Sequence, residues 1–404
     1  MKCSSFFIGL CLCSFFLTGC GSKTASEKTF LADNVKFAAR QYIRQTDELS
    51  QREKIRFPYS IDEQGKVAIT TYHDWRSGFF PGSLWYLYAL TEDETWLPLA
   101  EEYTVALEKA KKITWHHDVG FIVGCSYLNG LRFAHKEAYK EVIVEAAQSL
   151  STRFRPAAGV IQSWNVDKGW QRPGWKCPVI IDNMMNLELL FEATRLSGDS
   201  VYHKIAVSHA DKTLENHFRT NASCYHVVDY DPETGEVRSK QTAQGYADDS
   251  AWARGQAWAI YGYTMCYRYT HDPKYLKQAC RVYDFIFTHK RLPEDLIPYW
   301  DYDALNIPNE PRDASAAAVT AAALYELQLY APSLPCRELA DKIVASLATP
   351  VYRAEEGRNG NFILMHSVGS MPHNKEVDVP LNYADYYFLE ALYRKFNEDF
   401  ITED

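Results

Sequence analysis

Hydrophobic residues recur with helical spacing along most of the chain. Apolar side chains three and four positions apart, bounded by Gly, Pro and capping residues, predict a succession of helices. These helices cover residues 30–48, 81–92, 95–113, 119–134, 136–152, 183–197, 199–219, 250–270, 273–289, 313–331, 335–348 and 382–397. Two short segments, 159–164 and 225–230, have the β-branched character of strands. The pattern therefore predicts an all-α fold with short β insertions in its loops.

Three helix junctions share one pattern, which indicates repeated helical hairpins. In each, a helix ends in a polar turn, an Asp caps the next helix, and an aromatic residue packs back across the hairpin. The pairs are Asp93 with Trp96, Asp199 with Tyr202, and Asp272 with Tyr275, and a degenerate fourth copy ends at Tyr139. Stacked hairpins form an open solenoid or a closed ring. Because no capping repeat is evident, we expect an α/α toroid, with polar residues of alternate junctions at one mouth.

The aromatic content and the charge narrow the class of ligand. Aromatic residues make up 14% of the sequence, including 27 Tyr and 10 Trp, which is more than a core usually needs. Indole and phenol faces stack on sugar rings, so the composition favours glycan binding. A net charge of -9 argues against a nucleic-acid partner. It leaves room for an anionic ligand, because an acidic protein can carry a local basic pocket.

The N-terminal segment is typical of a bacterial lipoprotein leader. Lys2 precedes the apolar run 6–17, which is too short to span a bilayer as a helix, and Leu17-Thr-Gly-Cys20 resembles a lipoprotein cleavage box. We expect residues 1–19 to be a signal peptide and 20–28 a polar tether. Lipid on Cys20 would anchor the exported protein in the cell envelope, facing the periplasm, without a membrane span. The alternative is an ordinary signal peptide that happens to end in Cys.

The mature chain shows neither a linker nor a metal motif. No Pro/Gly/Ser-rich stretch divides it, so residues 29–404 are expected to form one domain. The cysteines outside the leader are scattered without C-x-x-C spacing, and no zinc pattern is present. We expect buried free thiols rather than disulfides, and neither a metal nor a cofactor.

Asp182 is the first candidate for chemistry. It follows the β-branched run 179–181 and precedes a helical pattern, so a helix N-cap is one interpretation. If apolar neighbours shield it from water, its pKa rises and it can donate a proton near neutral pH. Polar and indole side chains that a core helix does not need lie close in the chain: Asn183, Asn186, Trp164, Trp170 and Trp175.

Asp118 is a second carboxylate at a predicted helix start. It follows His117 and precedes an apolar run, so it also fits an N-cap. Two carboxylates in one cleft can divide the work of proton donor and charge stabiliser when their surroundings separate their pKa values. His117 can contact a substrate, bind a metal or serve the structure, although its spacing is not that of H-E-x-x-H.

The segment 244–258 is the richest in polar and aromatic residues. Asp249 or Ser250 is expected to cap its helix. The side chains that can then reach one mouth are Trp252, Arg254, Gln256 and Trp258. Arg254 offers a planar fork for a carboxylate or sulfate. Alternatively, the two Trp residues belong to the core, and Asp248 and Asp249 neutralise Arg254.

Two later segments complete the set of candidates. A polar block contains Asp301, Asp303, Glu310, Arg312 and Asp313. We interpret this block as architectural, with Asp313 or Ser315 as the cap of an Ala-rich helix. Ser367 and Ser370 lie on a Gly-containing loop that can close over a ligand.

These segments resemble the unsaturated glucuronyl hydrolases of glycoside hydrolase family 88. The motifs are His117-Asp-Val-Gly-Phe121, Ile181-Asp-Asn-Met-Met-Asn186, Tyr225-His-Val-Val-Asp-Tyr-Asp-Pro232, Gln244-Gly-Tyr-Ala-Asp-Asp-Ser-Ala-Trp-Ala-Arg-Gly-Gln-Ala-Trp258 and Ile307-Pro-Asn-Glu-Pro-Arg-Asp-Ala-Ser315. The resemblance covers nearly all of the chain after the tether, in family order. It implies an (α/α)6 toroid, which is more specific than the hairpin pattern alone.

The resemblance also implies an unusual reaction. The substrate is the C4=C5 unsaturated uronic acid that lyases leave at the non-reducing end of chondroitin, hyaluronan or heparin oligosaccharides. Protonation at C4 and addition of water at C5 give a hemiketal, which opens and expels the neighbouring sugar. No carboxylate attacks the anomeric carbon, so carboxylate separation does not predict retention or inversion here.

The resemblance assigns roles to matching residues. Asp182 is the general acid and then the base, and Asp118 assists it. The implied uronate site consists of His117, His226, Gln244, Trp252, Arg254 and Trp258, with Trp75 and Trp164 as stacking faces. Ser367 and Ser370 match loop positions that meet the next sugar. Pro372 stands where some relatives have a sulfate-favouring Lys, and Lys375 follows, so the sulfate preference stays open.

Alternatives remain at this point. One is an unsaturated rhamnogalacturonyl hydrolase that acts on pectin fragments, and another is a non-catalytic glycan-binding lipoprotein. In the favoured interpretation the partner is a small oligosaccharide, the membrane is reached through lipid only, and the protein is a monomer or a weak homodimer.

Overall fold

The computed structural model describes residues 24–166, 174–397 and 400. The α-helices are α1 (Ala25–Ser50), α2 (Phe79–Thr91), α3 (Trp96–Val105), α4 (Val119–Val123), α5 (Asn129–Ala134), α6 (Tyr139–Ser151), α7 (Leu187–Ser197), α8 (Ser200–Asn216), α9 (Ala253–Thr270), α10 (Pro273–Thr288), α11 (Ala314–Tyr330), α12 (Cys336–Leu347) and α13 (Asn382–Phe396). Short 3-10 turns are η1 (Trp75–Gly78), η2 (Glu108–Lys112), η4 (Ile181–Asn186), η5 (Asn359–Asn361) and η6 (Met371–His373), and η3 (Gly124–Leu128) is a π-helical turn. The predicted helices are present, although 95–113 and 119–134 are each divided into shorter helical pieces.

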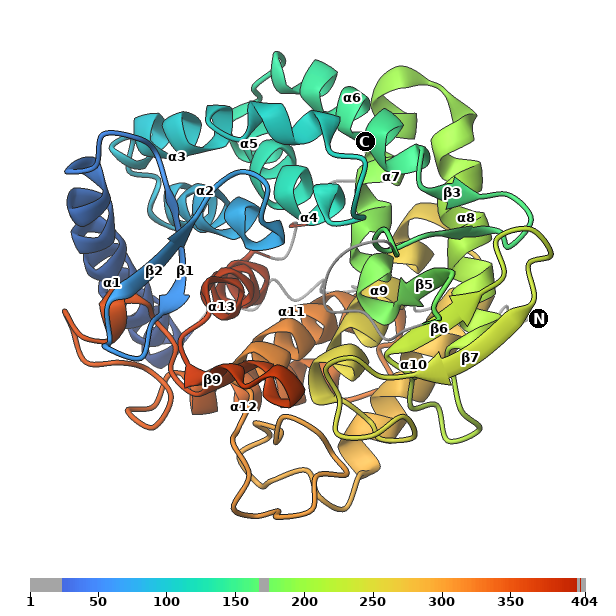
Figure 1. The fold of residues 1–404 in the computed structure, drawn as a ribbon. Coiled ribbons are helices and arrows are strands. Elements are labelled where there is room, and N and C mark those ends of the chain that lie inside the picture. The colour runs from blue at the N-terminus through green and yellow to red at the C-terminus, as the bar shows by residue number, and fades with distance from the viewer. Residues whose placement is uncertain (1–23, 167–173, 398–399, 401–404) are drawn as a thin grey trace, which may run out of the picture.

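The helices form two concentric rings (Figure 1). Around the centre follow α2, the α4–α5 run, α7, α9, α11 and α13, and α13 packs against α2, which closes the inner ring. The outer helices α1, α3, α6, α8, α10 and α12 each pack against a neighbouring inner helix. The predicted α/α toroid is therefore confirmed.

The inner helices α11 and α13 are buried on nearly all sides. Most of α11 and all but one residue of α13 are buried, as expected for helices enclosed by their neighbours. A single apolar cluster extends from Phe37 to Phe396 and joins the first and last parts of the described chain.

Two of the three hairpin junctions have the predicted Asp cap. At the first junction the prediction is wrong, because Thr95 occupies the N-cap of α3 without a side-chain bond and Asp93 accepts from the amide of Thr95 instead. Asp199 accepts a hydrogen bond from the amide of Val201 at the start of α8, and Asp272 does the same for Lys274 at the start of α10. The ring of Tyr275 packs against Tyr263 across the α9–α10 hairpin, with 6.0 Å between ring centroids. Local capping and one aromatic contact thus fix the reversal of the chain.

The start of the described chain corrects one prediction. Residues 25–28, expected to belong to the tether, form the first turn of α1. The reason is a capping box, in which Thr24 accepts from the amide of Glu27 while the Glu27 carboxylate accepts from the amide of Thr24. The expected signal peptide, Cys20 and Trp170 lie outside the described residues.

Short antiparallel strands decorate the loops. They are β1 (Phe57–Ile61), β2 (Val67–Thr70), β3 (Phe154–Arg155), β4 (Val160–Ile161), β5 (Cys177–Ile180), β6 (Val227–Tyr230), β7 (Val237–Gln241), β8 (Ser367–Ser370) and β9 (Lys375–Val379). They pair as β1-β2, β3-β4, β5-β6-β7 and β8-β9. The predicted β segments contain β4 and β6. The pairing of β5 with β6 matters most for the site. Just beyond these strands the amide of Ile181 donates to the backbone carbonyl of His226, which brings Asp182 beside that histidine.

Two further features bear on the environment of the protein. Within the described ranges, no helix is both long enough and apolar enough to cross a bilayer. The cysteines of these ranges are free thiols, and all but Cys280 are buried.

Candidate active site

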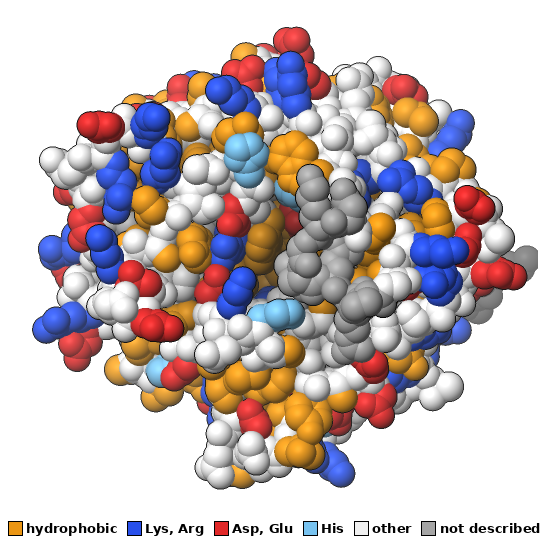
Figure 2. Space-filling model, viewed as in Figure 1, with side chains coloured by type: hydrophobic (Ala, Val, Ile, Leu, Met, Phe, Trp, Pro, Cys, Tyr) orange, Lys and Arg blue, Asp and Glu red, His pale blue; other side chains and the backbone are white. Residues whose placement is uncertain are grey.

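The candidate residues gather at one end of the inner ring, where its helices begin. Trp75 precedes α2, Asp118 precedes α4, Asp182 lies in η4 before α7, Trp252 precedes α9 and Asp313 precedes α11. Figure 2 shows this face hollowed near its centre, with hydrophobic, acidic, basic and histidine side chains around the recess. The closed ring therefore brings together residues that lie far apart in the sequence.

Asp182 is shielded but not used as a helix cap. It is the second residue of η4, Ile180 occupies the cap position, and no side chain caps this turn. Asp182 is 9% exposed, and its Oδ2 has no hydrogen-bond partner among the described residues. Burial raises the pKa of this carboxyl to about 7, against the opposing charge of Arg254. The N-cap interpretation of Asp182 is therefore wrong. The raised pKa makes its carboxyl a group that can donate a proton near neutral pH.

His226 faces Asp182 as a neutral donor. Its Nδ1 accepts hydrogen bonds from the amides of Ala243 (3.0 Å) and Gln244 (3.1 Å), which places the ring hydrogen on Nε2. That Nε2 lies 3.7 Å from Oδ2 of Asp182. Burial holds the pKa of His226 well below its usual value, so the ring stays uncharged. A neutral histidine does not stabilise the ionised form of Asp182 as a cation would.

Asp118 has the opposite electrostatic state. Its Oδ1 lies 3.2 Å from Nε2 of His117, and His116 adjoins its other oxygen. Burial would raise the pKa of Asp118, but His117, His116 and Arg153 together lower it below the usual value. One carboxylate is thus ionised while the other retains its proton near neutral pH, which is the division of work expected for an acid and a charge stabiliser.

Arg254 is buried and already engaged. Its Nη1 pairs with Asp313 at 2.9 Å and donates to the carbonyl of Val368, while Nη2 donates to the carbonyl of Gly369 at 2.7 Å. Its guanidinium also lies over the ring of Trp252, 4.5 Å from the centroid. Sequence reasoning assigned Asp313 only as a cap. It does cap α11, but it is also the counter-ion of Arg254.

The acidic residues before α9 do not play the predicted roles. Asp248 accepts from the amide of Thr242 (2.9 Å) instead of neutralising Arg254. Ser250 does not cap α9, which begins at Ala253 with Trp252 in the cap position. Its hydroxyl donates to Asp301 (2.7 Å), which confirms the architectural interpretation of that carboxylate.

The four tryptophans proposed for the uronate site divide into two pairs. Trp252 and Trp258 are almost fully buried, as the alternative core interpretation proposed, although the N–H of Trp258 is near enough to lower the pKa of Asp182. Trp75 and Trp164 are only partly buried. Trp75 packs against Tyr383 with 5.0 Å between centroids. Trp75 and Trp164 are therefore the more exposed of the two pairs.

The loop around β8 forms one wall of the site. Gln244 donates to the carbonyl of Gly369 (2.9 Å), which ties this loop to the segment before α9. Ser367 is buried, whereas Ser370 is partly exposed and bonds to Nδ1 of His373 at 2.7 Å. Sequence reasoning missed His373, for which no motif gave a signal.

A closed α/α ring with a differentiated carboxylate pair and partly exposed indoles at its mouth is the architecture of a helical glycoside hydrolase. The profile of Glycosyl Hydrolase Family 88 matches residues 49–278. The chain belongs to this family, and its (α/α)6 toroid is the fold that the resemblance implied.

Individual relatives support this membership. An unsaturated glucuronyl hydrolase of Formosa agariphila is 49% identical over 325 residues, which cover 80% of each chain. The crystal structure of an unsaturated glucuronyl hydrolase specific for heparin is 40% identical, with a TM-score of 0.85 over 91% of this chain and 97% of that one. A mutant unsaturated glucuronyl hydrolase from Streptococcus agalactiae, complexed with dGlcA-GalNAc6S, is 28% identical with a TM-score of 0.77, over 94% of each chain.

Proposed function

We propose that this protein is an unsaturated glucuronyl hydrolase that removes the C4=C5 unsaturated uronic acid from the non-reducing end of glycosaminoglycan oligosaccharides. The observation that carries the proposal is the contrast between a shielded Asp182 with a pKa of about 7 and an ionised Asp118 in the same recess. The family and the named relatives give the substrate class.

The reaction follows from these states. The carboxyl of Asp182 gives its proton to C4 of the enol ether, and positive charge develops at C5 and the ring oxygen. Asp118 keeps its negative charge and stabilises this oxocarbenium character. Water adds at C5 and returns a proton to Asp182. The resulting hemiketal opens and releases the neighbouring sugar with its hydroxyl, so atoms and charge balance over the cycle.

The other residues bind and orient the sugar. Neutral His226 presents its Nε2 hydrogen to the bound sugar beside Asp182, and His117 holds Asp118. Trp75 and Trp164 offer stacking faces, with Gln244, Trp252, Arg254 and Trp258 behind them. Of the two loop serines, the partly exposed Ser370 is placed to meet the sugar beyond the uronate, whereas Ser367 is buried.

The test is the loss of ultraviolet absorbance from unsaturated disaccharides. Chondroitin, hyaluronan, heparin and rhamnogalacturonan disaccharides are assayed side by side, each with and without sulfate where it occurs. Turnover of glycosaminoglycan disaccharides supports the proposal, and preference for the pectin fragment favours the rhamnogalacturonyl alternative. Binding without turnover of any of them would indicate a glycan-binding lipoprotein.

We further propose that the protein is exported and lipid-anchored through Cys20, which rests on the leader sequence alone. A labelled fatty acid should be incorporated into the full chain and not into the Cys20→Ser variant. Equal labelling of both chains would contradict the anchor and leave the enzymatic proposal untouched.

A further inference from the structure

Asp118 occupies the N-cap position of α4 without capping it. The first amides of a helix lack acceptors inside the helix, and the side chain at the N-cap normally accepts from the second or third of them. Asp118 makes no such bond. Its carboxylate is turned toward His117 instead, at 3.2 Å.

Asn186 supplies the missing cap from another segment. Its Oδ1 accepts from the amide of Phe121, the third residue of α4, at 2.8 Å. Asn186 is fully buried, so this bond is not shared with solvent. It is the last residue of η4, the short helix that also carries Asp182. The two turns that present the candidate carboxylates are thus joined by one hydrogen bond.

Gly120 lets these two turns touch. A Cβ atom added at Gly120 would lie 2.4 Å from Oδ1 and 2.6 Å from Cα of Asn186, distances that real side chains do not adopt. The obstructing atoms include backbone, so rotation of a side chain would not relieve the contact. Gly124, one turn further along the same run, is different, because its added Cβ would meet only Leu128 Cδ1 at 3.9 Å.

We propose that Asn186 and Gly120 are positioning residues for the carboxylate pair. Asn186 caps α4 in place of Asp118, which leaves the Asp118 carboxylate for the reaction, and Gly120 sets the separation of the two turns. This inference rests on the proposed function, since it needs a reaction in which both carboxylates take part.

Loss of the Asn186 oxygen has a definite consequence. The amide of Phe121 then needs another acceptor, and the side chain at the N-cap, Asp118, is the group placed to supply it. Asp118 would leave His117 and turn toward the start of α4. Asn186→Ala should therefore act through Asp118 and not independently of it.

A double-mutant cycle tests this dependence. The unaltered protein, Asn186→Ala, Asp118→Asn and the double variant are compared by kcat/KM on an unsaturated disaccharide. We expect Asn186→Ala to lower kcat/KM about 30-fold when Asp118 is present and less than about threefold in the Asp118→Asn background. A role confined to folding would give the same loss in both backgrounds, and that result would overturn the proposal.

Gly120→Ala provides the second route if Asn186→Ala does not fold. It should lower kcat/KM at least about tenfold, with the loss again much smaller in the Asp118→Asn background. The matched control Gly124→Ala, in the same helical run, should stay within about twofold of the unaltered protein. Equal effects of the two Gly variants would contradict the assigned contact. If the unaltered protein does not turn over the disaccharide, the proposed function fails, whereas additive losses in an active protein refute only the positioning role.

Discussion

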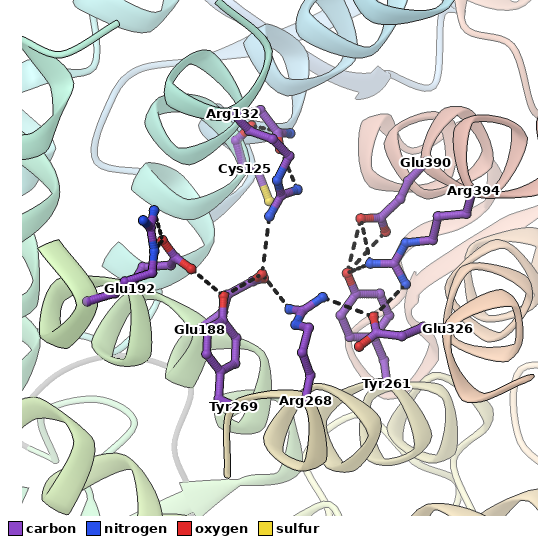
Figure 3. A network of polar contacts seen from close by, with 12 residues as sticks. Cys125, Arg132, Glu188, Glu192, Tyr261, Arg268, Tyr269, Glu326, Glu390 and Arg394 are labelled. Carbon is purple, nitrogen blue, oxygen red and sulfur yellow. Dashed lines mark hydrogen bonds and ion pairs between the residues drawn. The ribbon is translucent and has the colours of Figure 1, made fainter. Parts of the chain in front are cut away.

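Two polar layers lie at different depths along the axis of the toroid, and they are built in opposite ways. The deeper layer is a belt of charged side chains contributed by the inner helices, from the first turn of α7 to the C-terminal parts of α9, α11 and α13 (Figure 3). It consists of Arg132, Glu188, Arg268, Glu326, Arg394 and Glu390. Each of these six residues has an oppositely charged partner within 3.5 Å.

The layer at the mouth keeps polar atoms without such partners. Among the described residues, Oδ2 of Asp182 and Nε2 of His226 have no hydrogen bond, although they lie only 3.7 Å apart. A buried polar group without a partner costs about 1–3 kcal/mol. In the belt, Glu390 accepts from the hydroxyls of Tyr86 on α2 and Tyr261 on α9 and pairs with Arg394. Arg268 Nε and Glu326 Oε1 of the belt also lack a hydrogen bond within the described part of the chain, but both side chains have ion-pair partners. The comparison teaches that buried charges in the belt are neutralised by ion pairs, whereas the mouth holds an uncharged histidine and a carboxyl with a raised pKa, which face each other without a bond.

The largest expected effect is at the mouth. Asp182→Asn keeps the shape of the side chain but removes its proton, so kcat should fall about a thousandfold or more. Substrate should still bind, because the stacking faces and neutral donors remain. Turnover is followed by ultraviolet absorbance and binding by calorimetry. Turnover within about tenfold of the unaltered protein would exclude Asp182 as the acid.

A belt residue should show the reverse pattern. Arg394→Met removes the charged partner of Glu390 and one of the two charged partners of Glu326, and should lower the free energy of unfolding by about 3–5 kcal/mol. At temperatures where the variant is folded, kcat/KM should change little, since Arg394 bonds to Glu326, Glu390, Tyr261 and the carbonyl of Ala322, none of which is a candidate site residue. Chemical denaturation and the disaccharide assay measure the two effects. A loss of kcat/KM without a loss of stability would contradict the claim that the belt serves stability and the mouth serves catalysis.

The pH dependence of stability sharpens the contrast. The pKa of Asp182 is raised in the folded protein to about 7, so its contribution to stability is fully present below pH ~4 and is lost as pH rises toward 7. Asp182→Asn has no carboxyl to ionise at this position. As the pH rises from ~4 to ~7, its free energy of unfolding should therefore increase by about 2–4 kcal/mol relative to that of the unaltered protein. Asp301 and Asp385, whose pKa values burial also raises, titrate in both proteins and cancel in the difference. A difference that is constant with pH would show that Asp182 is ionised throughout.

The smallest effect is expected at the open edge of the belt. Arg132 lies 3.5 Å from Glu188, and its side chain is 34% exposed. Arg132→Ala should therefore cost less than about 1 kcal/mol in unfolding free energy. Denaturation alongside Arg394→Met makes the comparison. Equal losses of unfolding free energy from Arg132→Ala and Arg394→Met would mean that the stabilisation from an ion pair of the belt does not depend on its burial.

Local signals in the sequence predicted most of the fold. Helical periodicity, and caps such as Asp199 and Asp272, depend on residues near one another in the chain, so the helices and hairpins could be inferred. Strands as short as β5 carry too few residues for a recognisable alternation. Closure of the ring by α13 against α2 joins distant segments, and only the absence of a capping repeat indicated it.

The sequence predicted which residues form the site, but not the hydrogen bonds and ion pairs between them. Asp182, Asp118 and His226 were named from motifs, and the structure brings them together. Which carboxylate neutralises Arg254 could not be predicted, because Asp313 lies 59 residues away and the nearer Asp248 accepts from the amide of Thr242 instead. The cap of α4 was misassigned for the same reason, since Asn186 is 65 residues from Phe121.

The protonation state of Asp182 is the direct test of the whole account. The carboxyl signal of isotope-labelled aspartate can be followed against pH by NMR and assigned by its absence in Asp182→Asn. A carboxyl that loses its proton with a pKa of about 7 is the predicted result. A side chain that is already ionised at the pH of an ordinary aspartate would contradict it.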